Sequence, residues 1–206
     1  MKKLVILGGG GYSKSIIDSI DHDLYEIAGF IDTYKTGNHQ GYPILANSLQ
    51  ELSQKNKYHY FIGIGEPAVR YYFYNLLKKY ELKLVNIIDK SALVSRDVIL
   101  GSGIYIGKMS IVNPDTKIAD CAVINTRSLI EHGNCVGCCS NISTNVVLNG
   151  DVKVDELTFI GSSSVINGQL LIGKNSIIGS GSVVIRNVPD NVVVVGAPAK
   201  IIKERK

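Results

Sequence analysis

Aliphatic residues recur at every sixth position throughout the second half of the chain. Stepping by six residues from Ile88 to Val184, all 17 positions hold isoleucine, leucine or valine. Chance does not produce such agreement when only about a quarter of residues are of these types. A strict six-residue period is typical of a parallel β-helix, in which three hexads complete one triangular coil. We therefore predict about five and a half coils whose aliphatic side chains stack along the interior.

Small residues occupy neighbouring positions of the same hexads. Glycine often follows the aliphatic residue, and alanine, serine or threonine often stands four residues after it. Members of the second set are Ala92, Ser110, Thr116, Ala122, Ser128, Ser140, Ser164, Ser176 and Ser182. Such side chains fit the corners of the coils. An ordinary β-sandwich, the alternative, would lose a six-residue phase within a few strands.

The first half of the chain predicts a small α/β domain. Strands are expected at 4–7, 27–31 and 58–64, and helices at 13–20 and 67–80. This alternation favours a parallel, Rossmann-like sheet. We place a sugar- or nucleotide-sugar-binding domain at residues 1–85, a β-helix at 86–190 and a C-terminal tail at 191–206.

A glycine turn between the first strand and the first helix, followed by Asp32, is typical of a nucleotide site. Backbone N–H groups at a helix N-terminus attract phosphate, and an acidic residue binds a ribose hydroxyl. However, the dinucleotide motif G-x-G-x-x-G would need a third glycine where Ser13 stands, and 85 residues are too few for an NAD domain. We favour a smaller nucleotide or sugar pocket bordered by Tyr12 and Asp32, with a simple tight turn as the alternative.

Composition and charge exclude several classes of protein. With 45% hydrophobic and 19% charged residues, the chain is too apolar to be disordered. The net charge of +4 is spread thinly, so no nucleic-acid partner is expected. The apolar runs are too short for a membrane span or a signal peptide, which predicts a cytoplasmic protein. Cys121, Cys135, Cys138 and Cys139 are then expected to be reduced, and one C-x-x-C pair without a second pair predicts no metal site.

The sixth hexad position, which faces outward, is unusually apolar. It holds Ile111, Val123, Leu129, Val147, Phe159, Val165, Leu171, Ile177 and Val183. A soluble monomer rarely exposes so continuous a patch. We therefore predict a homotrimer around the β-helix axis.

Four segments carry a resemblance to a known family. They are the hexads, NTRSLIEHGNC at 125–135, IGSGSVVIRNVPDNVVVVGAPAK at 178–200, and the opening LGGGGYSKSIID. Together they resemble the sugar O-acyltransferases, and most of all the sialic acid O-acetyltransferases of bacterial capsule gene clusters. The resemblance implies a left-handed β-helix, a homotrimer, acetyl-CoA between neighbouring β-helices, and an N-terminal domain that holds a sugar acceptor.

His132 is the candidate general base. Acyl transfer from a thioester needs a base for the acceptor proton and donors for the oxyanion. His132 is the only histidine of the hexad region, and an idle turn histidine is the alternative. The nucleotide-sugar branch of the family has an acidic residue directly after this histidine, where Gly133 stands. Glu131 precedes it as a candidate orienting residue, although neighbours on an extended strand point to opposite sides.

The resemblance also implies the acetyl-CoA contacts. The same branch has a second histidine where this chain has Asn141, whose stacked equivalents are Val123 and Phe159. The Asn141 amide is a candidate donor to the thioester oxygen or the pantetheine, and a simple interface amide is the alternative. Further implied contacts are Gly161, Ser162, Gly179 and Ser180, with Arg186, Lys200 and Lys203 as candidate phosphate-binding cations.

Acceptor contacts are implied at Gly10, Gly11, Tyr12 and Asp32. The nucleotide-sugar branch has a histidine in place of Tyr12 and a second acidic residue in place of Thr33. These departures argue against a uridine-nucleotide acceptor. The sequence thus predicts an acetyl-CoA-dependent O-acetyltransferase acting on sialic acid or a related activated sugar in capsule or surface polysaccharide biosynthesis. The alternatives are a nucleotide-amino-sugar N-acetyltransferase and a non-catalytic trimeric partner of a sialic acid pathway enzyme.

Overall fold

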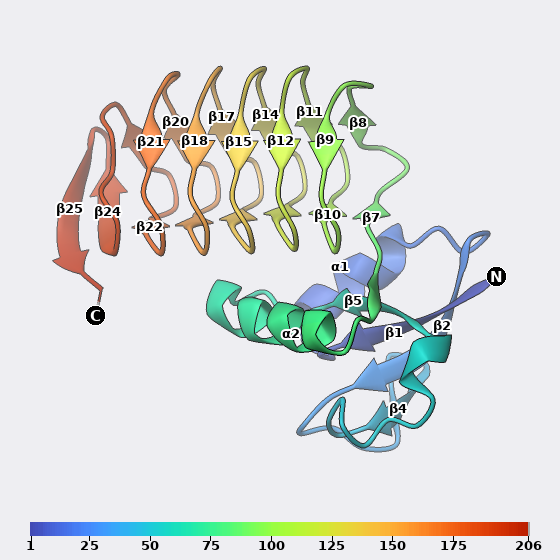
Figure 1. The fold of residues 1–206 in the computed structure, drawn as a ribbon. Helices are drawn as coiled ribbons and strands as arrows, with labels where there is room; N and C mark the ends of the chain where they lie inside the picture. Colours follow the sequence, from blue (N-terminus) through green and yellow to red (C-terminus); the bar gives the residue numbers. More distant parts are fainter. Residues whose placement is uncertain (206) are drawn as a thin grey trace.

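In the computed structural model, which describes residues 1–205, an α/β domain lies against one face of a three-sided parallel β-helix (Figure 1). The elements of the α/β domain are β1 (Lys2–Leu7), α1 (Gly11–Ser19), β2 (Tyr25–Ile31), β3 (Asn38–His39), β4 (Tyr42–Ala46), the 3-10 helix η1 (Lys55–Lys57), β5 (His59–Ile62), α2 (Pro67–Lys79) and β6 (Lys83–Leu84). Their sheet has the order β3-β4-β2-β1-β5-β6, parallel except for the β3-β4 pair. The predicted Rossmann-like arrangement is confirmed.

The central strand of this sheet is buried on both faces. Leu4, Val5, Ile6 and Leu7 are all fully buried, as expected of a parallel strand covered by helices on each side. Helix α2 begins at Pro67, whose fixed φ suits the first turn of a helix. Proline has no backbone N–H, but an N–H at this position would have no acceptor within the helix.

The β-helix is built from 17 two-residue strands, β7 to β23. The first face consists of β7 (Ile87–Ile88), β10 (Tyr105–Ile106), β13 (Val123–Ile124), β16 (Asn141–Ile142), β19 (Phe159–Ile160) and β22 (Ile177–Ile178). The second face consists of β8 (Leu93–Val94), β11 (Ile111–Val112), β14 (Leu129–Ile130), β17 (Val147–Leu148), β20 (Val165–Ile166) and β23 (Val183–Val184). The third face consists of β9 (Ile99–Leu100), β12 (Lys117–Ile118), β15 (Cys135–Val136), β18 (Lys153–Val154) and β21 (Leu171–Ile172).

Residues 18 positions apart pair in register, so the six-residue pattern becomes a continuous core. Ile106 pairs with Ile124, which in turn pairs with Ile142. From Ile106 to Val184 every aliphatic residue of the period is at most 2% exposed, which confirms the stacking. The expectation is wrong at the first coil, where Ile88 is 37% exposed, because no preceding coil covers it.

Buried hydroxyls at the corners tie each coil to the next one. The Ser110 hydroxyl donates to the carbonyl of Asn125, and the Ser128 hydroxyl donates to that of Ser143, each at 2.8 Å. Ser110 and Ser128 are at most 1% exposed. The small residue that the hexad requires is therefore also a hydrogen-bond donor to a backbone carbonyl 15 residues later.

The segment assigned to a C-terminal tail forms two further strands. β24 (Val192–Gly196) pairs in parallel with β22, and β25 (Ala199–Glu204) pairs antiparallel with β24. They extend the first face by two strands (Figure 1). Lys206 lies outside the described residues.

The α/β domain packs on the first face of the β-helix, through α1 and α2. Tyr105 and Val123, which point outward from the first face, share a buried cluster with Ile16 of α1. On α2, the Tyr74 hydroxyl donates to the Asp120 carboxylate at 2.6 Å. Figure 1 shows both helices beneath this face, on the side away from the turns that join the second face to the third.

Candidate functional site

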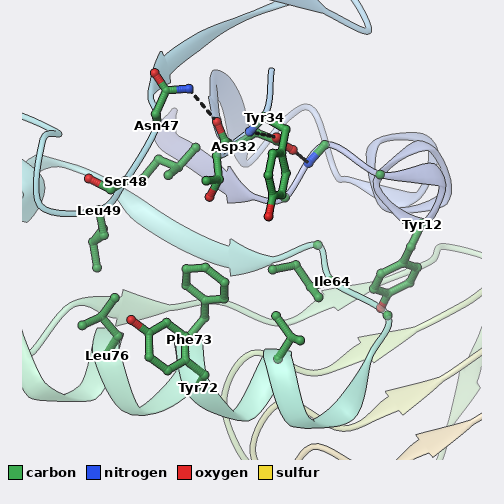
Figure 2. Close-up of a pocket in the computed structure, with 18 of the residues that line it drawn as sticks. Tyr12, Asp32, Tyr34, Asn47, Ser48, Leu49, Ile64, Tyr72, Phe73 and Leu76 are labelled. Atoms are coloured by element: carbon green, nitrogen blue, oxygen red, sulfur yellow. Dashed lines mark hydrogen bonds between the residues drawn. The ribbon is translucent and has the colours of Figure 1, made fainter. Parts of the chain in front are cut away.

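A cavity of about 600 Å³ opens at the carboxyl ends of β1, β2 and β5 (Figure 2). In the sheet, β2 pairs with one edge of β1, and β5, which comes later in the chain, pairs with the other edge of β1. Such a switch point leaves a crevice between the loops and is the usual ligand site of an open α/β sheet. The residues that follow the three strands line the cavity, namely Gly8 to Tyr12, Ile31 to Tyr34, and Gly63 to Gly65. All four predicted acceptor residues, Gly10, Gly11, Tyr12 and Asp32, are among them.

Asp32 organises the loops at the mouth of this cavity. Its carboxylate accepts hydrogen bonds from the backbone N–H groups of Gly9 (2.8 Å), Tyr34 (3.0 Å) and Lys35 (3.1 Å). Burial alone would raise the pKa of this carboxyl, but the three backbone donors and the Lys35 charge outweigh burial and lower it below its ordinary 3.8. Asp32 is therefore ionised at neutral pH and holds the glycine loop after β1 against the turn after β2.

We expect Asp32→Asn to cost about 1–3 kcal/mol of unfolding free energy, because an amide nitrogen cannot accept from the Gly9 N–H. The folded pKa is lowered, so the stabilisation is complete above the unfolded pKa and is lost as pH falls through the folded pKa. Urea titrations of both proteins should show a constant difference at neutral pH that shrinks below about pH 4. A difference that does not depend on pH would contradict this role of the carboxylate.

The opposite wall of the cavity is an apolar stripe of α2. Val69, Tyr72, Phe73 and Leu76 line the cavity, and Figure 2 shows the last three on the cavity side of the helix. Tyr74 and Leu77 face the protein core. Sequence reasoning missed this wall, although the spacing 69, 72, 73, 76 is a second apolar stripe on a helix whose first stripe is already buried. A planar, partly apolar ligand fits such a surface.

Tyr12 closes the end of the glycine loop toward the β-helix. Its ring packs edge-on against Tyr105 of the first face, with ring centroids 5.5 Å apart. Its hydroxyl is buried and has no hydrogen-bond partner within residues 1–205. Burial raises the pKa of Tyr12, and the nearby Arg70 offsets this only in part. The hydroxyl therefore remains a protonated donor.

His132 lies in the turn between β14 and β15, on the edge where the second and third faces meet. Its ring is exposed and packs on the next coil, since a Cβ at Gly150 would lie 2.6 Å from its Cε1. The carboxylate of Glu131 accepts from the Asn113 amide at 3.1 Å. The hydrogen bonds of the described residues include none between Glu131 and His132. The structure therefore gives Glu131 a partner other than the imidazole.

Asn141 lies on the first face, in register with Val123 and Phe159. It is 6% exposed, and its amide nitrogen donates to the Ser143 hydroxyl at 3.0 Å. Nine residues separate it from His132, which is half of an 18-residue coil. The two side chains therefore lie on opposite sides of the same β-helix, and one chain does not bring them together.

The other predicted acetyl-CoA contacts fall into two groups. Gly161, Ser162, Gly179 and Ser180 directly follow β19 and β22, on the edge between the first and second faces. Arg186 and Lys200 together line a separate cavity of about 290 Å³ near the C-terminal end of the β-helix, whereas Lys203 lines a different one of about 450 Å³. The structure thus brings two of the three predicted cations together.

Three of the four cysteines pack against the α/β domain. Cys121 and Cys139 are buried, and the thiols of Cys138 and Cys139 are 3.8 Å apart. The adjacent Cys121 thiol, together with burial, raises the pKa of Cys139 to about 12, which makes it a poor nucleophile. Within residues 1–205, no group of three or more His, Cys, Asp or Glu side chains is arranged to hold a metal ion. None of the helices described there is long and apolar enough to cross a membrane.

Known proteins resemble both parts of the chain. Residues 3–77 match the PglD N-terminal domain family. The structure of PerB from Caulobacter crescentus in complex with CoA and GDP-perosamine is 31% identical, with a TM-score of 0.90 over 98% of each chain. The acetyltransferase domain of PglB from Neisseria gonorrhoeae, 23% identical, has a TM-score of 0.93 over 98% of this chain and 100% of that domain, and shows the same fold.

One curated protein matches a shorter stretch of the chain. An uncharacterised protein of Acanthamoeba polyphaga mimivirus is 29% identical over 105 residues. The match covers 51% of this chain and 21% of that protein, so the chain spans about a fifth of the length of this relative.

The chain belongs to the family of hexapeptide-repeat sugar acetyltransferases with a PglD N-terminal domain. The predicted fold, a small α/β domain followed by a left-handed parallel β-helix, is confirmed. The predicted resemblance to sugar acyltransferases is confirmed to the extent that the chain belongs to a family of sugar acetyltransferases. Specificity for sialic acid stays a prediction.

Proposed function

We propose that this protein transfers the acetyl group of acetyl-CoA to the amino group of a nucleotide-linked amino sugar. The observation that carries the proposal is the glycine-lined cavity at the switch point of the sheet, in a chain 31% identical to a protein solved with both CoA and GDP-perosamine. A structure of a histidine-to-asparagine mutant of perosamine N-acetyltransferase from the same organism, with the same two ligands, is likewise 31% identical. These relatives favour N-acetylation over the sialic acid O-acetylation expected from the sequence.

The cavity suits a nucleotide sugar. Gly10 precedes the first residue of α1, Gly11, and added Cβ atoms at both positions would meet nothing within 4 Å. A diphosphate can therefore approach the backbone N–H groups at the start of this helix. The aromatic stripe of α2 offers a stacking surface for the base. Tyr12 lines the end of this cavity nearest the β-helix.

We propose a homotrimer in which each active site is shared by two copies. The α/β domain covers the first face, whereas His132 lies on the edge opposite that face. A sugar held by the α/β domain of one copy can therefore meet only the His132 of another copy. The second face, which adjoins His132, presents an apolar row of outward side chains that supports such an interface: Leu93, Ile111, Leu129, Val147, Val165 and Val183.

The chemistry then divides between the copies. His132 of one copy accepts a proton from the acceptor amine as the amine attacks the thioester carbonyl. The tetrahedral intermediate then breaks its C–S bond, and the departing CoA thiolate takes the proton from His132 to leave as the free thiol. Asn141 of the other copy donates to the oxygen on which negative charge develops. Arg186 and Lys200, which line one cavity near the C-terminal end, are suitable partners for the phosphates of acetyl-CoA.

An acceptor panel tests this function. Purified protein, acetyl-CoA and one candidate acceptor are incubated, and thiol release is followed while the product mass is recorded. The acceptors are GDP-linked, UDP-linked and dTDP-linked 4-amino sugars, CMP-sialic acid and free sialic acid. We expect turnover with an amino sugar nucleotide and a product heavier by one acetyl group. Acetylation of a sialic acid alone would reject the proposal in favour of O-acetylation, and no turnover with any acceptor would favour a scaffold.

A further inference from the structure

Arg70 of α2 is a buried arginine at the joint between the two parts of the chain. It is 1% exposed. Its Nε donates to the Cys121 carbonyl at 2.8 Å, and its Nη2 donates to the carbonyls of Cys139 (2.8 Å) and Ser140 (3.4 Å). Its Nη1 donates to the Ile64 and Gly65 carbonyls, both at 2.8 Å. The five N–H donors of a guanidinium thus match five carbonyl oxygens.

No carboxylate within residues 1–205 forms an ion pair with this guanidinium. Removing a charge from water is expensive, and an apolar residue of similar size often stabilises a core better. Simple adhesion between the domains therefore does not require an arginine. What an apolar side chain cannot do is hold five carbonyl oxygens at once, because only the rigid fork of a guanidinium presents five N–H donors.

The two groups of carbonyls belong to different halves of the site. Ile64 and Gly65 form the loop after β5 and line the acceptor cavity. Ser140 directly precedes Asn141 on the first face, and Cys121 and Cys139 lie on the adjoining edge. We propose that Arg70 is a positioning residue that fixes the acceptor cavity relative to the strand carrying Asn141, so that the held sugar meets the thioester at reacting distance. The proposal rests on the proposed function.

Two other polar contacts of the joint lack this connection. Tyr74, one turn further along α2, bonds Asp120 on the same edge of the β-helix, and Lys108 pairs with Asp18 of α1. None of these four residues lines the acceptor cavity, and neither contact includes a residue of the loop after β5. Tyr74→Phe therefore weakens the same joint without touching the loop that Arg70 holds, which makes it the matched control.

The test compares steady-state kinetics of Arg70→Lys, Arg70→Gln and Tyr74→Phe with the unchanged protein. Lysine keeps the charge but loses the planar fork. Because a displacement of about 1 Å costs up to 10²-fold in rate, we expect kcat of Arg70→Lys to fall about 10- to 100-fold. The KM for acetyl-CoA should stay within about twofold, since the β-helix is unchanged. Tyr74→Phe should keep kcat within about twofold even if its melting temperature falls.

Rescue of kcat by free guanidinium separates a positioning role from a merely structural one. Arg70→Ala leaves a cavity in which guanidinium can bind, whereas Arg70→Met fills the same space. Millimolar guanidinium chloride should raise kcat of Arg70→Ala and leave kcat of Arg70→Met unchanged. Equal responses of the two variants would contradict the proposal.

The remaining outcomes are also decisive. If Arg70→Lys and Tyr74→Phe lose stability alike and keep the kcat of the unchanged protein, Arg70 is adhesive only and the proposal fails. If both Arg70→Lys and Arg70→Gln fail to fold while Tyr74→Phe folds, Arg70 is required for folding and the positioning role is rejected. If the unchanged protein acetylates no acceptor, it is the proposed function that has failed.

Discussion

Replacing His132 with asparagine should lower kcat by about 10²- to 10⁴-fold, which is the usual contribution of a general base. The side chain is exposed on its edge of the β-helix, so the change leaves the core intact. The KM for acetyl-CoA should stay almost unchanged, because proton transfer is lost while positioning survives. Steady-state kinetics with the best acceptor of the panel measures both constants. A rate within about threefold of the unchanged protein would remove His132 from the mechanism.

Glu131→Gln is the matched control for this variant. The Glu131 carboxylate contacts Asn113 of the preceding coil, and a side-chain amide can keep that hydrogen bond. We expect kcat of Glu131→Gln to stay within about threefold of the unchanged protein. A loss as large as that of His132→Asn would show that Glu131 orients the imidazole in the assembled site.

Asn141→Leu should cost about 2–4 kcal/mol of transition-state stabilisation if the amide donates to the thioester oxygen. Leucine has a similar volume and continues the apolar column formed by Val123 and Phe159, so the assembly should remain intact. Ser143→Ala removes only the hydroxyl that accepts from the Asn141 amide. We expect that variant to lose less activity, because the donor itself remains.

A different result is expected if Asn141 is only an interface amide. Asn141→Leu then removes a buried polar group from apolar surroundings, so the melting temperature rises and the rate does not change. Melting curves and kcat measured on the same preparation separate the two roles. Full activity with a raised melting temperature would reject a catalytic part for Asn141.

Mixing the two inactive variants tests whether the sites are shared between copies. Each His132→Asn copy keeps an intact first face, and each Asn141→Leu copy keeps an intact His132. If the variants are coexpressed in equal amounts and assemble at random, about a quarter of the sites are intact. Activity should return to about a quarter of the unchanged level, in particles of about 67 kDa by light scattering, three times the 22.4 kDa chain. No recovery in mixed trimers would place each site within one chain.

The β-helix was predictable because its stabilising contacts repeat along the sequence. Each core residue, such as Ile124, packs on residues 18 positions away that obey the same six-residue rule. Periodicity therefore reveals long-range neighbours that a sequence normally hides. The same rule places His132 and Asn141 on opposite sides, since their separation is half a coil.

The joint between the domains was not predictable for the opposite reason. Arg70 contacts residues 51 and 69 positions further along the chain, and no repeat connects them. A single arginine in an amphipathic helix is expected to lie on the face exposed to solvent. The apolar wall of α2 was also hidden, because a second apolar stripe gains its meaning only when the glycine loops are seen opposite it.

The constant coil length makes this β-helix a molecular ruler. His132 and Arg186 are 54 residues apart, which corresponds to three coils and, at ~4.8 Å per coil, to roughly 14 Å along the axis. Between them in the same column stand only Gly150, on which the His132 ring packs, and Gly168. Adding or deleting one whole coil would keep the remaining corners and core residues in register, yet it would change this spacing by ~4.8 Å. In the proposed function, where His132 accepts the proton and Arg186 binds the acetyl-CoA phosphates, the number of coils rather than any single side chain sets the length of co-substrate that fits between them.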